Sequence, residues 1–255
     1  MLLATVSRFQ ILRIVALLLA VLAIWYRSAL TFSLVVLVFL TVIGLGVKIP
    51  QLRLFGPYVC RGAGKGRRVA LTFDDGPDPR STPALLEVLR EAKVKAAFFC
   101  IGQRVVANPA LAASIVREGH LLENHSYSHS HATNMFTEPR LKTELTQTQT
   151  AIEQATGVVP KCFRPPLGLS NPRIFRVARA LGLTVIGWTA RGFDTKLTEP
   201  KQIVARIIRK LQPSAIILLH DGNIPAERLV TTVKILLDTL HGLDYEVARL
   251  DKVLT

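Results

Sequence analysis

Two neighbouring carboxylates, Asp74 and Asp75, end an apolar run that begins at Val69. Gly76 and Pro77 follow directly, so the run is typical of a buried strand that stops at a turn. Side chains alternate along an extended chain, so one carboxylate could hold a metal ion while the other moves a proton. Asp-Asp-Gly-Pro is also an ordinary turn sequence, because Asp and Gly favour turns for local reasons. The residues further along the chain decide between the two interpretations.

Two histidines, His125 and His129, follow a later apolar segment. On a helical turn, this spacing would place both rings on one face, where they could bind one metal ion. With Asp75 they form a set that leaves coordination positions open for water and substrate. Zinc suits these ligands, and cobalt, nickel or iron would also fit. The same spacing is also common on solvated surfaces; His131 is an alternative ligand, and His120 is expected to be structural.

Three further polar residues follow predicted strands. Arg164 lies in the stiff segment 163–168, Asp194 offers a carboxylate that could hold this guanidinium, and His220 ends an apolar strand. A buried Arg–Asp pair or a core histidine is the ordinary interpretation of any one of them. Because the carboxyl ends of parallel barrel strands meet on one face, we expect all these segments to line one site.

The chain after residue 68 alternates between short apolar segments and amphipathic ones. The predicted strands are Val69–Phe73, Ala96–Ile101, His120–Asn124, a short one at Phe163, Leu183–Trp188, Ala215–Leu219 and Tyr245–Ala248. Pro, Thr and Asn residues mark helix starts between these strands, and Gly residues mark helix ends. This alternation indicates an α/β fold with a parallel sheet and helices outside it. About seven repeats favour a barrel over an open sheet.

The first 50 residues have a different composition, with no Asp or Glu and only four basic residues. Two apolar runs, 14–26 and 29–47, approach or reach the roughly 20 residues that span a bilayer. We therefore predict that residues 1–50 form a membrane anchor, a transmembrane hairpin of two helices. One long tilted helix is an alternative. A cleaved signal peptide is another, although the apolar stretch is long for one and lacks a clear cleavage site.

A basic segment, 51–67, connects this anchor to the predicted barrel. Its Gly-rich part, 61–68, superficially resembles a phosphate-binding loop. However, it precedes its strand, and no Ser or Thr follows Lys65, so we expect a flexible basic linker. Under the positive-inside rule, basic residues on this side would place the following domain in the cytoplasm, but the side of the membrane stays open. The three cysteines show no disulfide framework.

The formal net charge is +14. Such a charge suits a position beside an anionic membrane, and it would also suit a lipid-linked or anionic glycan substrate. No interleaved aromatic and basic motif is evident, so we expect no nucleic-acid partner. The oligomeric state cannot be inferred from the sequence.

The segments at the five strand ends resemble the five motifs of the NodB-like polysaccharide deacetylases, carbohydrate esterase family 4. The resemblance extends from about Arg68 to Leu254, so residues 68–255 are expected to form one deacetylase domain. It implies a distorted (β/α) barrel and a hydrolase that removes N-acetyl groups from the amino sugars of a glycan. The implied partner is an N-acetylated glycan or a lipid-linked amino sugar.

The resemblance also implies roles for individual residues. Asp74 would be the general base, and His220 would protonate the leaving amine. The divalent metal, most simply Zn²⁺, would be held by Asp75, His125 and His129.

Further roles follow from the same resemblance. Arg164 would orient Asp74, and Asp194 would hold Arg164. Leu218 would line a pocket for the acetyl methyl group, and a backbone N–H near Leu167 would stabilise the oxyanion. Leu167, Leu218 and Pro165 are the expected substrate contacts.

The chain departs from the family pattern at three positions. Many relatives have Tyr at the position of Leu167, Asp at that of Arg191 and Trp at that of Thr195. These positions shape substrate contacts more than metal chemistry, so the identity of the sugar stays open. The alternatives are an O-acetyl esterase, a deacetylase or deformylase of a polyprenyl-linked sugar, and a non-catalytic metal- or glycan-binding barrel.

Overall fold

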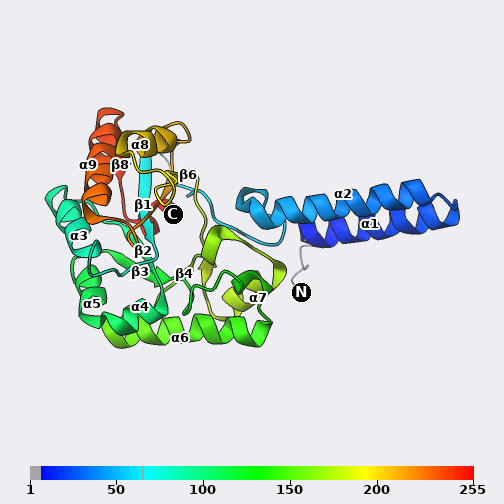
Figure 1. Cartoon of the computed structure of the whole chain (residues 1–255), viewed down its shortest axis with the longest axis horizontal. Coiled ribbons are helices and arrows are strands. Elements are labelled where there is room, and N and C mark those ends of the chain that lie inside the picture. The colour runs from blue at the N-terminus through cyan, green and yellow to red at the C-terminus, as the bar shows by residue number, and fades with distance from the viewer. Residues whose placement is uncertain (1–6, 65) are drawn as a thin grey trace.

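A computed structural model describes residues 7–64 and 66–255 of the chain. Figure 1 shows a curled sheet with helices packed around its outside, and a pair of long helices, α1 and α2, that projects away from it. The predicted α/β class, with a distorted barrel of about seven strands, is confirmed.

The sheet is a curled, open half-barrel whose paired strands run parallel. The strand order is β5-β4-β3-β2-β1-β7-β6, and β8 pairs with β1 off this path. The strands are β1 (Arg68–Asp74), β2 (Ala97–Cys100), β3 (Leu121–Asn124), β4 (Cys162–Phe163), β5 (Thr184–Val185), β6 (Ala190–Arg191), β7 (Ala215–His220) and β8 (Glu246–Val247). The two long central strands, β1 and β7, are almost wholly buried because helices cover the sheet.

The register between β1 and β7 places polar residues of the two strands side by side. Thr72 lies beside Leu218, and Asp74 lies beside His220. Residues at matching positions of a parallel pair point to the same side of the sheet, so the two strands deliver a carboxylate and an imidazole to one edge.

Helices fill the connections and cover the outside of the sheet (Figure 1). They are α3 (Thr82–Glu91), α4 (Gly102–Ala107), α5 (Pro109–Arg117), α6 (Glu138–Thr156), α7 (Pro172–Ala180), α8 (Pro200–Ile208), α9 (Ala226–Gly242) and α10 (Leu250–Leu254), with single 3-10 turns η1 (Pro50–Leu52), η2 (Thr133–Met135) and η3 (Pro166–Gly168). Several begin with Pro in the first turn, where its missing N–H costs no hydrogen bond. α7 shows the expected cap, because the Asn171 side chain accepts from the N–H groups of Arg173 and Ile174.

The predicted strand Leu183–Trp188 is only partly correct. The structure has a short strand, β5, and then a separate strand, β6, which pairs with β7. Gly187 interrupts the run, and an added Cβ there would come within 2.7 Å of the Cys60 sulfur. The preceding segment of the chain therefore packs closely against this glycine, and the Gly187 N–H donates to the Val59 carbonyl.

That preceding segment, Tyr58–Gly62, belongs to the region predicted as a linker, and it packs on the half-barrel. Val59 forms a bridge with Ile186, and Arg61 forms one with Ala215 of β7. Tyr58 is 1% exposed. The segment thus lies across the opening between β5 and β7 and completes the wall there.

The two N-terminal helices are α1 (Arg8–Trp25) and α2 (Ala29–Lys48), which lie side by side (Figure 1). Each is long and apolar enough to cross a membrane, by length and composition. Their large apolar side chains are mostly exposed. The start of α1 contacts the segment that follows α2, since Phe9 packs edge-on against Phe55 and the Arg8 side chain donates to the Leu52 carbonyl.

Candidate active site

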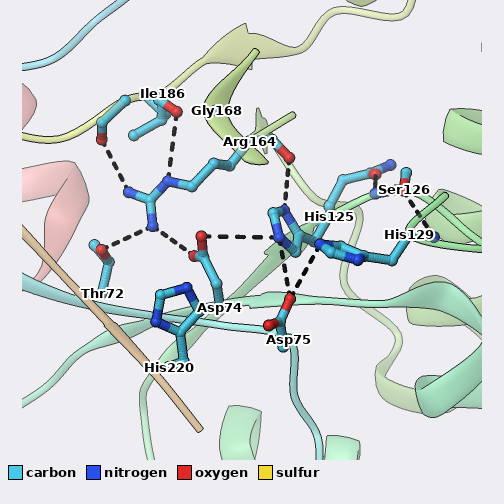
Figure 2. Close-up of polar contacts among 12 residues, drawn as sticks. Thr72, Asp74, Asp75, His125, Ser126, His129, Arg164, Gly168, Ile186 and His220 are labelled. Carbon is cyan, nitrogen blue, oxygen red and sulfur yellow. Dashed lines mark hydrogen bonds and ion pairs between the residues drawn. The ribbon is translucent and has the colours of Figure 1, made fainter. Parts of the chain in front are cut away.

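The most deeply buried ion pair of the site joins Asp74, at the end of β1, to Arg164, which follows β4. The Arg164 Nη1 donates to the Asp74 Oδ1 at 2.6 Å and to the Thr72 hydroxyl at 2.9 Å. Arg164 is fully buried and Asp74 is 4% exposed. Figure 2 shows the guanidinium held between Thr72, Asp74 and backbone carbonyls. This pairing agrees with the expectation that Arg164 orients Asp74.

The expected contact between Asp194 and Arg164 was wrong. The remaining guanidinium N–H groups donate to the carbonyls of Gly187, at 2.9 Å, and Ile186, at 3.4 Å. The guanidinium also lies 4.0 Å from the centre of the Phe99 ring. Asp74, one hydroxyl group, two carbonyl groups and an aromatic ring therefore surround the Arg164 guanidinium, and Asp194 is not among its partners.

Asp194 instead holds His220. Its Oδ2 accepts from the His220 backbone N–H at 2.7 Å, and its Oδ1 lies 3.0 Å from the His220 Nδ1. Burial disfavours a charge on His220, but the hydrogen bond and the negative charge of Asp194 outweigh it and raise the His220 pKa to about 9. The imidazole is therefore protonated near neutral pH, with its Nε2–H free to donate.

Asp75, His125 and His129 converge as predicted. The Asp75 Oδ1 lies 3.4 Å from the His125 Nε2 and 3.2 Å from the His129 Nε2, and the three ligand atoms lie within 4.8 Å of one another. The three side chains face one another in Figure 2. The Asp75 Oδ1 is buried and has no hydrogen-bond partner among the described residues. An orphaned buried carboxylate oxygen beside two imidazole nitrogens fits a divalent cation.

A second contact fixes the His125 ring for this task. Its Nδ1 lies 2.7 Å from the Arg164 carbonyl oxygen, which can only accept, so the Nδ1 carries the proton. The Nε2 lone pair then faces Asp75 and is available to a metal ion. Arg164 thus supports Asp74 through its side chain and His125 through its backbone.

The expectation that His125 and His129 share a helical turn was wrong. They lie in a loop after β3, in which Ser126 and His129 have positive φ angles of 64° and 49°. The left-handed residues bring the two rings to 4.9 Å, between their centres, without a helix. The two histidines thus converge with Asp75, but through a loop and not through a helical turn.

Residues outside the predicted set hold this loop in place. The Glu144 side chain, on α6, accepts from the backbone N–H groups of Tyr127 and Ser128 and from the Ser128 hydroxyl. The Asn124 Oδ1 accepts from the Ser126 N–H. Sequence reasoning missed Glu144, since nothing near it in the chain marks it as different from a solvated helix residue.

A cavity of about 330 Å³ opens over these groups. It is lined by Asp74, Asp75, Ile101, His125, His129, His131, Leu167, Gly168, Trp188, Arg191, Thr195, Leu218, His220 and Asn223. Of the expected substrate contacts, Leu167 and Leu218 line the cavity, while Pro165 is buried at the start of η3 and does not. Leu167 is 53% exposed and has a φ of 59°, so it stands at the rim.

One family model matches residues 61–186, and its description is polysaccharide deacetylase. A peptidoglycan-N-acetylglucosamine deacetylase of Bacillus cereus is 32% identical over 188 residues, which are 73% of this chain and 87% of that protein. A chitooligosaccharide deacetylase of Bradyrhizobium is 33% identical over 189 residues, 73% of this chain and 85% of the relative. The chain belongs to the polysaccharide deacetylase family, the NodB-like family 4 carbohydrate esterases.

Solved structures of family 4 carbohydrate esterases have the same fold as this chain. A family 4 carbohydrate esterase from Streptomyces lividans, in complex with acetate, is 34% identical, with a TM-score of 0.66 over 72% of this chain and 93% of that one. A family 4 pseudoenzyme from Bacillus anthracis is 28% identical, with a TM-score of 0.73 over 78% of this chain and 69% of that one. Because the same fold occurs in enzymes and in a pseudoenzyme, the fold alone does not imply catalysis, which requires the right side chains in the site.

Metal content gives a direct test of the ligand set. We expect His125→Ala and His129→Ala to weaken Zn²⁺ binding on the order of 100-fold or more, since even losing a residue that only supports a ligand costs about 10- to 100-fold. Isothermal titration of the metal-free full-length protein with Zn²⁺ would measure the loss.

His131→Ala is the matched control. His131 lines the same cavity, and its ring centre lies 6.4 Å from that of His129. Its loss should leave the affinity close to that of the wild type. If His125→Ala kept its full affinity for Zn²⁺ and His131→Ala lost affinity, the ligand would be His131 and the assignment of His125 would be wrong.

Proposed function

We propose that the protein is a metal-dependent hydrolase that removes the N-acetyl group from an amino sugar of a glycan. The observation that carries this proposal is the placement of a base and an acid on neighbouring strands. Asp74 and His220, matched across β1 and β7, both face the cavity that contains Asp75, His125 and His129. A metal-binding barrel without catalysis would need neither group.

Asp75, His125 and His129 would hold the metal ion. A divalent cation in such a set lowers the pKa of a bound water and polarises a carbonyl oxygen. Zn²⁺ is the simplest choice for one carboxylate and two imidazoles, and Co²⁺ or Ni²⁺ is compatible with them.

Asp74 would take the proton from the attacking water. Its Oδ1 is occupied by Arg164, which leaves the Oδ2 to act as the base. Arg164 is a positioning residue in this account, since it contacts Asp74 and not the substrate. The backbone N–H of Leu167 would donate to the oxyanion, and Leu218 would contact the acyl methyl group.

His220 would give its proton to the nitrogen as the carbon–nitrogen bond breaks. Its Nδ1 faces Asp194, so the Nε2–H is the proton donor. Asp194 would be a positioning residue that keeps the imidazole protonated. The products would be acetate and a free amino sugar.

The comparisons support an N-acetylated glycan as the substrate, because relatives are named as deacetylases of peptidoglycan N-acetylglucosamine and of chitooligosaccharides. The apolar pair α1–α2 favours a second candidate, an amino sugar linked to a membrane lipid. We further propose that residues 1–50 anchor the protein in a bacterial-type inner membrane and that 51–67 connect this anchor to a deacetylase domain, 68–255.

Removal of the proposed base should strongly reduce turnover and leave the metal in place. For Asp74→Asn we expect acetate release from N-acetylglucosamine oligomers to fall by about 10²- to 10⁴-fold, the usual contribution of a general base. Acetate would be measured with the full-length, Zn²⁺-loaded protein in detergent. Metal content and melting temperature serve as controls, because Asp74 also pairs with buried Arg164. Retained activity would overturn the assignment of the base.

The proposed role of His220 as the acid predicts that activity is lost at alkaline pH. The His220 pKa is raised to about 9, so activity that needs the protonated ring should fall as the pH rises through that region. Asp194→Asn removes the negative charge that raises this pKa, and the alkaline limb of kcat/KM should therefore move to lower pH. The same shift should not occur in Asp238→Asn, a control on the outer helix α9. An unmoved limb in Asp194→Asn would contradict the role of His220.

Topology can be tested with reporters fused after Thr255. If α1 and α2 both cross the bilayer, a fusion to the full chain should be active on one side only. Deletion of α1 should move the reporter to the other side, because one crossing is lost. On the positive-inside argument, the full-length fusion should be active in the cytoplasm. Alkaline phosphatase activity of the full-length fusion would show that the C-terminus lies on the other side of the membrane, outside the cytoplasm.

A further inference from the structure

Arg191 is a cation of the cavity wall that the proposed reaction does not use. It is the last residue of β6 and pairs in register with Leu218 of β7. Arg191 lines the cavity, as do Trp188, Leu218 and Asn223. Because Arg191 and Leu218 are matched in a parallel pair, their side chains point to the same side of the sheet.

Aromatic rings hold the guanidinium in place. Its central carbon lies 4.4 Å from the centre of the Phe193 ring and 5.5 Å from that of Trp188. Such contacts with ring faces stabilise a cation and fix the plane of a guanidinium. The fork of N–H donors is thus pre-oriented, which reduces the entropy lost when it binds a ligand.

No carboxylate forms an ion pair with Arg191 within the described part of the chain. The two carboxylates that favour its charge are already engaged, Asp74 with Arg164 and Asp194 with His220. The Arg191 Nε is buried and has no hydrogen-bond partner. Burial accordingly lowers the Arg191 pKa from its ordinary value. A cation partly removed from water without a partner is unfavourable, and an anion in the cavity would offset that cost.

The cavity wall is also bonded to the base of the helix pair. The Trp188 carbonyl accepts from the Gln51 side chain at 3.1 Å, and Gln51 lies in η1, directly after α2. The Ser170 N–H, in the loop after Leu167, donates to the Val47 carbonyl at 3.3 Å. If α1 and α2 lie in a bilayer, the cavity opens near the depth of lipid headgroups.

We propose that Arg191 binds an anionic group of the substrate, carried on a sugar carbon next to the one that bears the acetamide. A guanidinium fork binds phosphate or carboxylate through two parallel hydrogen bonds. A phosphodiester at the first sugar carbon and a carboxylate on an ether at the third carbon are the two sources with this chemistry. Both neighbour the second carbon, where the acetamide is attached. The inference rests on the proposed deacetylase function and narrows its substrate.

Three substrates distinguish a phosphodiester from a carboxylate as the group that Arg191 binds. One is N-acetylglucosamine joined through pyrophosphate to a farnesyl chain, the second is the methyl glycoside of N-acetylmuramic acid, and the third is the neutral farnesyl glycoside of N-acetylglucosamine. Acetate release would be measured with the full-length protein in detergent, for the wild type and for Arg191→Gln. The quantity compared is the ratio of kcat/KM between each anionic substrate and the neutral one.

We expect the wild type to prefer an anionic substrate and Arg191→Gln to lower that ratio by about 10- to 100-fold, the usual value of a charge-assisted hydrogen bond. A loss with the pyrophosphate substrate alone would assign a lipid-linked sugar, and a loss with the muramic acid glycoside alone would assign the carboxylate. Arg206→Gln is the matched control. Arg206 lies over the same Phe193 ring at 5.5 Å and does not line the cavity, so its loss should not change the ratio.

An unchanged ratio in Arg191→Gln, with acetate still released, would overturn this inference and leave the deacetylase in place. Isothermal titration with the farnesyl pyrophosphoryl sugar and with the muramic acid glycoside tests whether Arg191 binds an anionic sugar even when no acetate is released. If no substrate released acetate but Arg191→Gln still weakened binding of one of them by about 10-fold or more, the proposed reaction would fail and the anion site would stand. If Arg191→Gln released acetate from the anionic substrates and bound them as well as the wild type does, the anion site would be refuted.

Discussion

The buried pair between Arg164 and Asp74 is the interaction on which the rest of the site depends. The Arg164 guanidinium contacts β1, β2 and the segment after β5, and it orients the proposed base. The carbonyl of the same residue fixes the His125 ring. Removing one partner of a buried pair costs about 3–5 kcal/mol, because the other charge is left uncompensated. The orientation of the base and that of a metal ligand therefore have a common support.

The sequence predicted the elements that carry this site because their signals are local. The apolar run into Asp74, the run into His220 and the histidine pair each mark a strand end, and parallel strands bring their carboxyl ends together. Thr72 could also have been found, since it lies two positions before Asp74 and so faces the same side of β1. The resemblance to a family added the division of roles between Asp74 and Asp75, which neighbouring carboxylates do not reveal by themselves.

The errors came from contacts between distant segments. Arg164 and Asp194 are opposite charges that follow successive predicted strands along the chain. Only the packing of the whole domain shows that backbone carbonyls surround Arg164 and that Asp194 accepts from the His220 N–H. The loop at His125 takes left-handed angles because Glu144, on α6, binds its N–H groups. Gly187 likewise packs against the segment at Tyr58, more than 100 residues earlier in the chain, and local sequence does not show this contact.

The balance of charges explains what the site is prepared to bind. Of the three carboxylates described at the site, Asp74 is paired with Arg164 and Asp194 with His220. Asp75 keeps a buried oxygen without a hydrogen bond, and the lining residue Arg191 keeps a buried N–H without an acceptor. These two unpaired groups have opposite charge, so they do not select the same ligand. A cation at Asp75 and an anion at Arg191 would each give one of these groups a partner, and an acetylated sugar that carries an anionic group would bring the anion together with the reacting acetamide.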